Sequence, residues 1–179
     1  IVHGGGKAIS RAIENSGHNV KFVGGLRVTD DTTMEIVRHT LNNVVNPDLD
    51  ARLQKRDTPA RPLHGNWLFG AKKITDPDRG YVGEVVSVDT RAVREMTDAG
   101  IVPVVTPLGT GVEDAHLYNI NADYAAAAFA KALKVRKFAL VSDVPGLLRD
   151  PANPATLIST LSLSDIDALK ADGTISGGM

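Results

Sequence analysis

The chain has no cysteine, no excess of charge of either sign and no long apolar run. The absence of cysteine excludes disulfides, thiolate metal ligands and a cysteine nucleophile, and it is typical of proteins in a reducing compartment. A formal net charge of −1 gives no broad attraction for nucleic acid or an anionic membrane, so an anionic ligand needs a local site. No stretch approaches the roughly 20 apolar residues of a membrane span, and the start lacks the basic segment of a signal peptide. These absences predict a cytoplasmic protein that binds neither nucleic acid nor membrane.

What is present predicts a single α/β domain. The 179 residues, 42% of them hydrophobic, can bury one substantial core. Apolar residues at helical spacing alternate with short apolar runs. This alternation predicts right-handed crossovers and a three-layer sandwich, with a mainly parallel central sheet and helices on both faces. The predicted helices cover residues 7–16, 31–45, 90–99 and 121–135, and the predicted strands cover residues 18–23, 68–75, 80–89, 101–109 and 137–146. Asp30 or Asp31 is expected to cap the second of these helices. The strands over residues 68–75 and 80–89 are expected to form an antiparallel pair around the turn at residues 76–80.

Residues 47–65 are the least regular part of the sequence. The stretch is polar, charge-dense and contains proline, which predicts either a partly helical excursion or a mobile loop. A lid over a binding site is one hypothesis for its role.

The first candidate ligand site is the glycine triplet at residues 4–6, between a strand end and a helix start. Glycines let backbone N–H groups approach an oxyanion, and the helix N-terminus adds partial positive charge, so a phosphate or a carboxylate would suit the turn. A tight turn without a ligand explains the triplet alone equally well. The motif is not a Walker loop, because Ala8 follows Lys7 where serine or threonine is required, and it does not match the dinucleotide fingerprint.

Two further loops and one arginine carry candidate polar groups. In NINAD, an extended backbone would project Asn119, Asn121 and Asp123 to one side, whereas the alternative is a helix N-cap with solvated neighbours. Asp143 either accepts hydrogen bonds from a nucleotide or belongs to a plain type II turn. Arg27 stands in a glycine-flanked turn and either contacts a carboxylate or is an exposed surface arginine. Because ligands bind at the carboxyl ends of the strands in such sheets, these loops are expected at one edge.

Five segments together resemble the amino acid kinase family, in its N-acetyl-L-glutamate kinase branch: HGGGK, GLRVTDDTTMEIV, NINADYAAAAFAKAL, LVSDVPGLL and GTISGGM. The resemblance spans nearly the whole chain and is weakest over residues 47–80. It implies an amino acid kinase-like fold and ATP-dependent phosphorylation of the γ-carboxylate of N-acetyl-L-glutamate, with Mg2+, in arginine biosynthesis. It also implies a homo-oligomer. Some relatives have a PII-type regulatory partner, but no residue here identifies one.

The resemblance also implies roles for individual residues. Gly5 and Gly6 would offer backbone N–H groups to the substrate and to the transferred phosphoryl group. Arg27 and Asn119 would hold the α-carboxylate and the acetamido end. Asn121 would support the same loop, and Asp123 would organise the catalytic lysines. The nucleotide pocket would be lined by Asp143, Val144, Pro145, Gly146, Leu147, Leu148, Thr174, Ile175 and Ser176. Residues 1–110 would lie mainly on the acyl-substrate side and residues 111–179 mainly on the nucleotide side.

The chemistry agrees with the residue inventory. A carboxylate acceptor is already ionised at neutral pH, so positioning and charge compensation suffice and no base or nucleophilic side chain is needed. The histidines show no clustered ligand spacing, no residue is assigned to a metal, and His3 is predicted to be a packing residue.

One departure from the family pattern concerns two lysines. Relatives carry a Lys-x-Gly-Gly loop before the region that matches Ile1, and a lysine shortly after the region that matches residues 177–179. Neither lysine is in this sequence, and Lys7 is not expected to replace them, so we expect an incomplete domain with little kinase activity of its own. Two alternatives stay open. One is a related kinase for acetylaminoadipate, aspartate, glutamate or carbamate, and the other is a non-catalytic amino-acid-sensing module.

Overall fold

The computed structural model describes residues 1–142, 144, 146–150 and 152–175. They form two compact units, Ile1–Phe138 and Ala139–Met179, and each is described by itself. The expected division into acyl and nucleotide sides near residue 110 stays a prediction.

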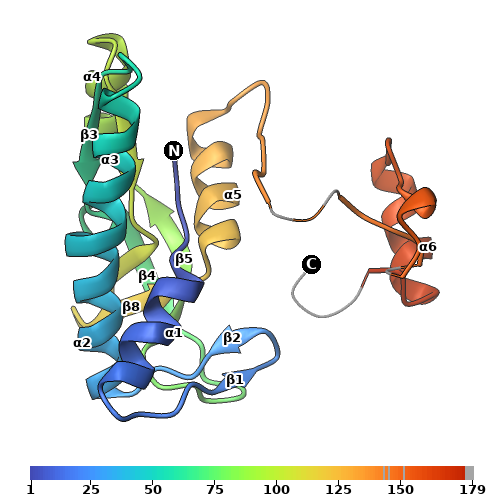
Figure 1. The fold of residues 1–179 in the computed structure, drawn as a ribbon, viewed down its shortest axis with the longest axis horizontal. Coiled ribbons are helices and arrows are strands. Elements are labelled where there is room, and N and C mark those ends of the chain that lie inside the picture. Colours follow the sequence, from blue (N-terminus) through green and yellow to red (C-terminus); the bar gives the residue numbers. More distant parts are fainter. Residues whose placement is uncertain (143, 145, 151, 176–179) are drawn as a thin grey trace. The chain divides into compact units, whose positions relative to one another are not determined.

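The first unit mixes helices and short strands (Figure 1). Its helices are α1 (Gly6–Asn15), α2 (Asp31–His39), the π-helical segment η1 (Thr40–Val45), α3 (Asn46–Gln54), the 3-10 turn η2 (Gly65–Trp67), α4 (Arg91–Asp98) and α5 (Ala122–Leu133). Its strands are β1 (Phe22–Val23), β2 (Leu26–Arg27), β3 (Ala60–Leu63), β4 (Phe69–Lys73), β5 (Val82–Val88), β6 (Val102–Val105), β7 (Leu108–Gly111) and β8 (Leu117–Ile120). The second unit holds η3 (Pro154–Thr156), η4 (Leu163–Asp165) and α6 (Ile166–Ala171).

The strands of the first unit form a parallel group and a closed mixed group. β3 and β6 pair in parallel, and the N-terminal segment joins β6 through a parallel bridge between Val2 and Val105. β4, β5, β8 and β7 close on themselves, with antiparallel β4–β5 and β7–β8 pairs and parallel β4–β7 and β5–β8 pairs. The α/β class and the antiparallel β4–β5 pair are therefore confirmed. The three-layer sandwich stays a prediction.

The helix predicted to end before Asn46 continues to Gln54, which corrects that boundary. Asp30 caps α2 as predicted, because its carboxylate accepts a hydrogen bond from the Thr33 N–H at 2.8 Å. α2, η1 and α3 then run on as one helical rod (Figure 1). Pro47 directly follows the π-helical segment η1, where the α-helical hydrogen-bond pattern is already interrupted and a missing N–H is better tolerated.

Residues 47–65 are largely ordered into α3 and β3, so the mobile-loop interpretation is wrong and the partly helical one is correct. The charge density that suggested a loop stabilises the helix instead. The Arg52 guanidinium contacts the Asp48 carboxylate one turn earlier at 2.7 Å, and Gln54 donates to Asp50 at the same spacing.

Three other predictions also need correction. The expected strand over residues 137–146 does not form among the described residues, because no neighbouring strand pairs with it, and Leu140 and Val141 are exposed. The strand expected over residues 18–23 shortens to β1, because only Phe22 and Val23 have ladder partners, across the turn at Gly24 and Gly25. The loop expected between β6 and α5 contains β7 and β8.

Two apolar clusters fill the first unit. One lies among the closed strand group, α4 and α5 and includes Phe69, Val93 and Phe129. The other joins α1 to the long helical rod through Ile9, Ile13, Met34, Val37 and Leu41, with Leu108 of β7. This second cluster fixes where α1 begins, and with it the glycine loop. Over the described residues, no helix combines the length and the apolarity needed to cross a membrane.

Candidate functional site

A cavity of about 550 Å³ lies in the first unit beside the glycine loop. Its walls come from the start of α1, the β1–β2 hairpin, the end of β8 and the first residue of α5. The lining includes five of the residues singled out from the sequence: Gly5, Gly6, Arg27, Asn119 and Asn121. Segments separated by about a hundred positions in the chain thus share one cavity.

Two helix N-termini meet at this cavity. α1 begins at Gly6 and has no side-chain cap, so the N–H groups of Gly6 and Ala8 have no partner within the helix. α5 begins next to Gly4, where an added Cβ would lie 3.6 Å from the Cβ of Ala122. Both helices therefore present the positive ends of their dipoles to one place, which favours an anionic ligand.

Arg27 lies in the cavity wall and is buried, with 7% of its surface exposed. Its Nη2 donates to the carbonyl oxygen of Gly6 at 3.1 Å and to Ser10 Oγ at 2.9 Å, and its guanidinium carbon lies 4.7 Å from the centre of the Phe22 ring. The Arg27 Nη1 is buried without a hydrogen-bond partner among the described residues. Burial lowers the pKa of Arg27. The exposed-arginine interpretation is wrong, because this side chain is a buried cation with one unmatched donor.

The charge of the lining has one sign. Lys7, Arg11 and Arg27 contribute to it, and among the described residues that line the cavity none is acidic. The whole chain carries a net charge of −1, so an anionic ligand can be attracted only by a local group of positive charges. The lining of this cavity contains such a group.

Asn119 is tied to the same network as Arg27. Its Nδ2 donates to Thr29 Oγ1 at 3.2 Å, and that hydroxyl donates to the carbonyl oxygen of Arg27 at 2.9 Å. Thr29 is fully buried, so this link cannot be replaced by water without rearrangement. Asn119 of β8 and Arg27 of β2 are therefore held in a fixed relation to each other.

Asn121 and Asp123 occupy different environments: Asn121 caps α5 and lines the cavity, whereas Asp123 does not line it. The Asn121 Oδ1 accepts hydrogen bonds from the N–H groups of Asp123 at 2.9 Å and Tyr124 at 3.2 Å, so the helix-cap interpretation is correct for Asn121. Asp123 is exposed in the first turn of α5 and is not among the residues that line the cavity. Its assignment to the catalytic lysines stays a prediction.

The residues predicted to bind the nucleotide fall in the second unit. Leu147 accepts a hydrogen bond from the Ile158 N–H at 2.9 Å, Leu148 bridges to Leu157, and the Thr174 and Ile175 N–H groups donate to Asp172 and Leu169. Val144 and Gly146 are described and exposed. Asp143, Pro145 and Ser176 lie outside the described residues. A nucleotide pocket built from these positions stays a prediction.

Two polar lining residues, Ser10 and Arg11, were missed by the sequence interpretation. Ser10 and Arg11 lie one turn after Gly6 and Lys7 on α1 and face the same cavity. Helical spacing from the glycine loop was the available signal, because side chains three or four positions apart share a helix face.

The described residues offer no protein-held metal site. No group of three histidine, cysteine, aspartate or glutamate side chains among them could surround an ion. His3 is buried against the parallel strands, and its Nδ1 lies 2.9 Å from the carbonyl oxygen of Gly4, to which it donates. Burial is the main cause of its lowered pKa.

Fold and cavity together define a class: an α/β protein with a candidate anion site made of a glycine loop, two helix N-termini and a buried arginine. The particular family follows from comparison with known sequences. The Amino acid kinase family matches residues 1–179, and the chain belongs to that family.

Individual relatives agree with this assignment. An acetylglutamate kinase from Clostridium beijerinckii is 43% identical over 182 residues, which cover 100% of this chain and 64% of that protein. The crystal structure of smu.665 from Streptococcus mutans UA159 is similar with a TM-score of 0.90 at 31% identity, covering 100% of this chain and 72% of that one. The crystal structure of N-acetylglutamate synthase from Neisseria gonorrhoeae, solved with coenzyme A and N-acetyl-glutamate, is similar with a TM-score of 0.77 at 28% identity. The match covers 96% of this chain and 40% of that one. The chain spans less than two thirds of the length of the first of these curated relatives.

Proposed function

We propose that this chain provides the acyl-substrate site of an ATP-dependent kinase that phosphorylates the γ-carboxylate of N-acetyl-L-glutamate in arginine biosynthesis. The buried, unmatched Nη1 of Arg27 in the cavity wall carries the proposal, because a substrate carboxylate would supply the missing acceptor. Similarity to proteins named acetylglutamate kinase supports the choice of ligand. The proposal includes a three-layer sandwich, a homo-oligomer and a cytoplasmic location.

In this proposal, Arg27 and Asn119 bind the α-carboxylate and the acetamido end. The other end of the ligand then points to the glycine loop, since both groups lie in one cavity with Gly5 and Gly6. A γ-carboxylate oxygen is ionised at neutral pH, so it attacks the γ-phosphorus of ATP without giving up a proton. The new bond joins that oxygen to phosphorus, the bond to the bridging oxygen breaks, and ADP leaves. The N–H groups of Gly5 and Gly6 and the α1 dipole offset the charge of the transferred group.

The nucleotide is proposed to bind through residues 143–148 and 174–176. Family membership supports the use of ATP. Mg2+ commonly binds through substrate phosphates with few protein ligands. The described residues include no group of three metal-binding side chains, so Mg2+ would be held mainly by the phosphates of ATP.

A calorimetric titration of the chain with N-acetyl-L-glutamate tests the site. We expect one ligand per chain, and we expect Arg27→Gln to raise the Kd about tenfold or more, since a hydrogen bond to a charged group contributes about 1.5–3 kcal/mol. Asp123→Asn is the matched control. It should change the Kd less than about twofold, because Asp123 does not line the cavity. Unchanged binding by Arg27→Gln, or equal small effects of both variants, contradicts the assignment.

The alternatives are tested in the same titration. Tighter binding of acetylaminoadipate, aspartate, glutamate or carbamate would indicate a kinase for another acceptor. The coding sequence upstream and downstream of this chain distinguishes a catalytic kinase from a sensing module. A Lys-x-Gly-Gly loop upstream and a lysine soon after Met179 support phosphoryl transfer, whereas their absence supports a non-catalytic amino-acid-sensing module.

A further inference from the structure

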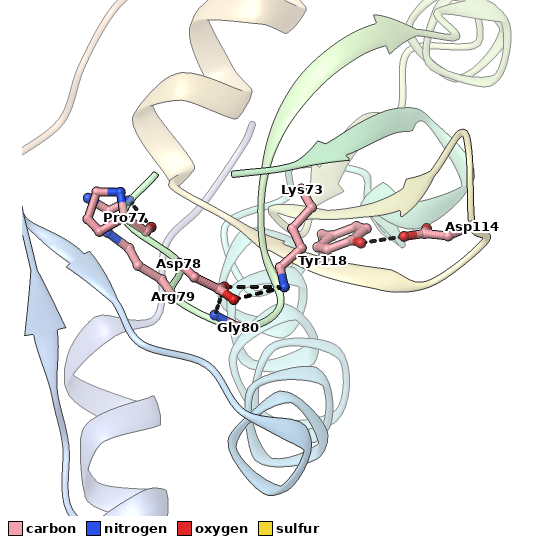
Figure 2. Close-up of polar contacts among 7 residues, drawn as sticks. All are labelled: Lys73, Pro77, Asp78, Arg79, Gly80, Asp114 and Tyr118. Carbon is pink, nitrogen blue, oxygen red and sulfur yellow. Dashed lines mark hydrogen bonds and ion pairs between the residues drawn. The ribbon is translucent and has the colours of Figure 1, made fainter. Parts of the chain in front are cut away.

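The turn between β4 and β5 is held together by its own polar contacts (Figure 2). The Asp78 carboxylate pairs with Lys73 Nζ at 3.2 Å and accepts the Gly80 N–H at 2.9 Å. Arg79 stands between these residues, and its Nη1 donates to the carbonyl oxygen of Pro77 at 3.0 Å. These contacts order the turn and fix the backbone that carries the Arg79 side chain.

Arg79 also reaches a segment more than fifty positions earlier in the chain, the β1–β2 hairpin. Its Nε donates to the carbonyl oxygen of Val23 at 2.9 Å, and only 8% of its surface is exposed. Its Nη2 lies 3.2 Å from where a Cβ would stand on Gly24, so the guanidinium sits directly against the hairpin turn. Backbone hydrogen bonds extend the contact, from the Thr29 N–H to the Arg79 carbonyl oxygen at 2.8 Å and from the Tyr81 N–H to the Thr29 carbonyl oxygen at 2.6 Å.

The β1–β2 hairpin needs such support. Its ladder pairs Phe22 with Arg27 and Val23 with Leu26, and an isolated hairpin of that size is not stable in water. The same hairpin places the Arg27 guanidinium over the Phe22 ring and in the wall of the cavity. Contacts that hold the β1–β2 hairpin in place therefore also hold the Arg27 guanidinium in the cavity wall.

We propose that Arg79 is a positioning residue of the anion site, which holds the β1–β2 hairpin so that Arg27 faces the ligand. Arg79 is not among the described residues that line the cavity, so it acts through the hairpin and not on the ligand. The identity of the ligand rests on the proposed function, but the contact between the turn and the hairpin does not.

The experiment combines ligand titration with hydrogen exchange. Arg79→Met keeps the aliphatic part of the side chain and removes both donated bonds, and Asp78→Asn weakens the same turn without touching the hairpin. We expect Arg79→Met to raise the Kd for N-acetyl-L-glutamate about tenfold. In an Arg27→Gln background it should cause no further loss, because the effect passes through Arg27. Arg79→Lys should restore part of the affinity.

Hydrogen exchange gives a readout without ligand. The Val28 N–H, bonded to the Lys21 carbonyl oxygen at 3.0 Å, should exchange faster in Arg79→Met and remain protected in Asp78→Asn. Equal losses of affinity with and without Arg27, or unchanged exchange at Val28, overturn the inference. If the wild-type chain does not bind N-acetyl-L-glutamate at all, the proposed function fails. The exchange measurement then still supports or refutes the role of Arg79 in holding the hairpin.

Discussion

Neighbouring glycines of the first loop should respond to alanine in opposite ways. A Cβ on Gly5 would lie 2.9 Å from Leu41 Cδ2 and 3.5 Å from both Ile9 and Val45. A Cβ on Gly6 would meet nothing within 4 Å. A side chain on Gly5 would therefore enter the apolar cluster between α1 and the helical rod, whereas a side chain on Gly6 would meet no packed atoms, although both residues line the cavity.

The magnitudes follow from these surroundings. Leu41 is fully buried, so it cannot swing into solvent, and overpacking of this kind costs about 1–3 kcal/mol. Gly6 is a helical residue of α1, and alanine at a compatible helical position stabilises by about 0.4–1 kcal/mol. In the proposed site, a methyl group on Gly6 would also narrow the approach of a ligand oxygen to the backbone of the glycine loop. We expect Gly6→Ala to weaken binding of N-acetyl-L-glutamate about tenfold or more.

Urea unfolding would check the predicted changes in stability, and calorimetric titration would check the predicted change in ligand affinity. Gly5→Ala should lower the free energy of unfolding and Gly6→Ala should keep or raise it, with the ligand affinity falling in the more stable variant. Gly4→Ala serves as a control for stability, because its Cβ would make an ordinary 3.6 Å contact with Ala122. Wild-type affinity in Gly6→Ala would refute the view that a ligand approaches this loop, and wild-type stability in Gly5→Ala would refute the packing argument.

Two further predictions concern stability alone. Asn46→Ala should lower the free energy of unfolding in urea by about 1–3 kcal/mol, because the fully buried Asn46 Nδ2 donates to the Val104 carbonyl oxygen at 2.9 Å, and an unchanged midpoint would contradict this. Burial, with the hydrogen bond to Asp114 shown in Figure 2, raises the pKa of Tyr118 from 10.0 to about 12. The unfolded state therefore ionises first, and stability should fall as the pH rises from 10 towards 12. Thermal unfolding should show a smaller fall in Tyr118→Phe, and an equal fall would contradict the assignment.

Local signals predicted the elements that frame the site. The glycine triplet marked the start of α1, Asp30 marked the cap of α2, and NINAD marked the start of α5. Each depends on side-chain to backbone contacts within a few residues, which a sequence displays directly.

The failures came where distant partners decide the structure. Residues 60–63 form a strand because β6 lies beside them, although their own composition is that of a loop. Residues 137–142 have the apolar composition of a strand but no pairing partner among the described residues. Strand formation requires a neighbour to bond with, and periodicity cannot reveal whether the fold supplies one.

The same distinction explains what could be predicted of the site. Arg27 was identified by its glycine-flanked turn, but its burial depends on Ser10 and Gly6 of α1, and the hairpin that carries it depends on Arg79. These contacts span 17, 21 and 56 positions, so no motif contains them. The proposed anion site therefore depends on two separate determinants, local sequence motifs and tertiary packing. Local motifs provide the donors, and the packing of two hairpins and one helix decides whether those donors face the same cavity.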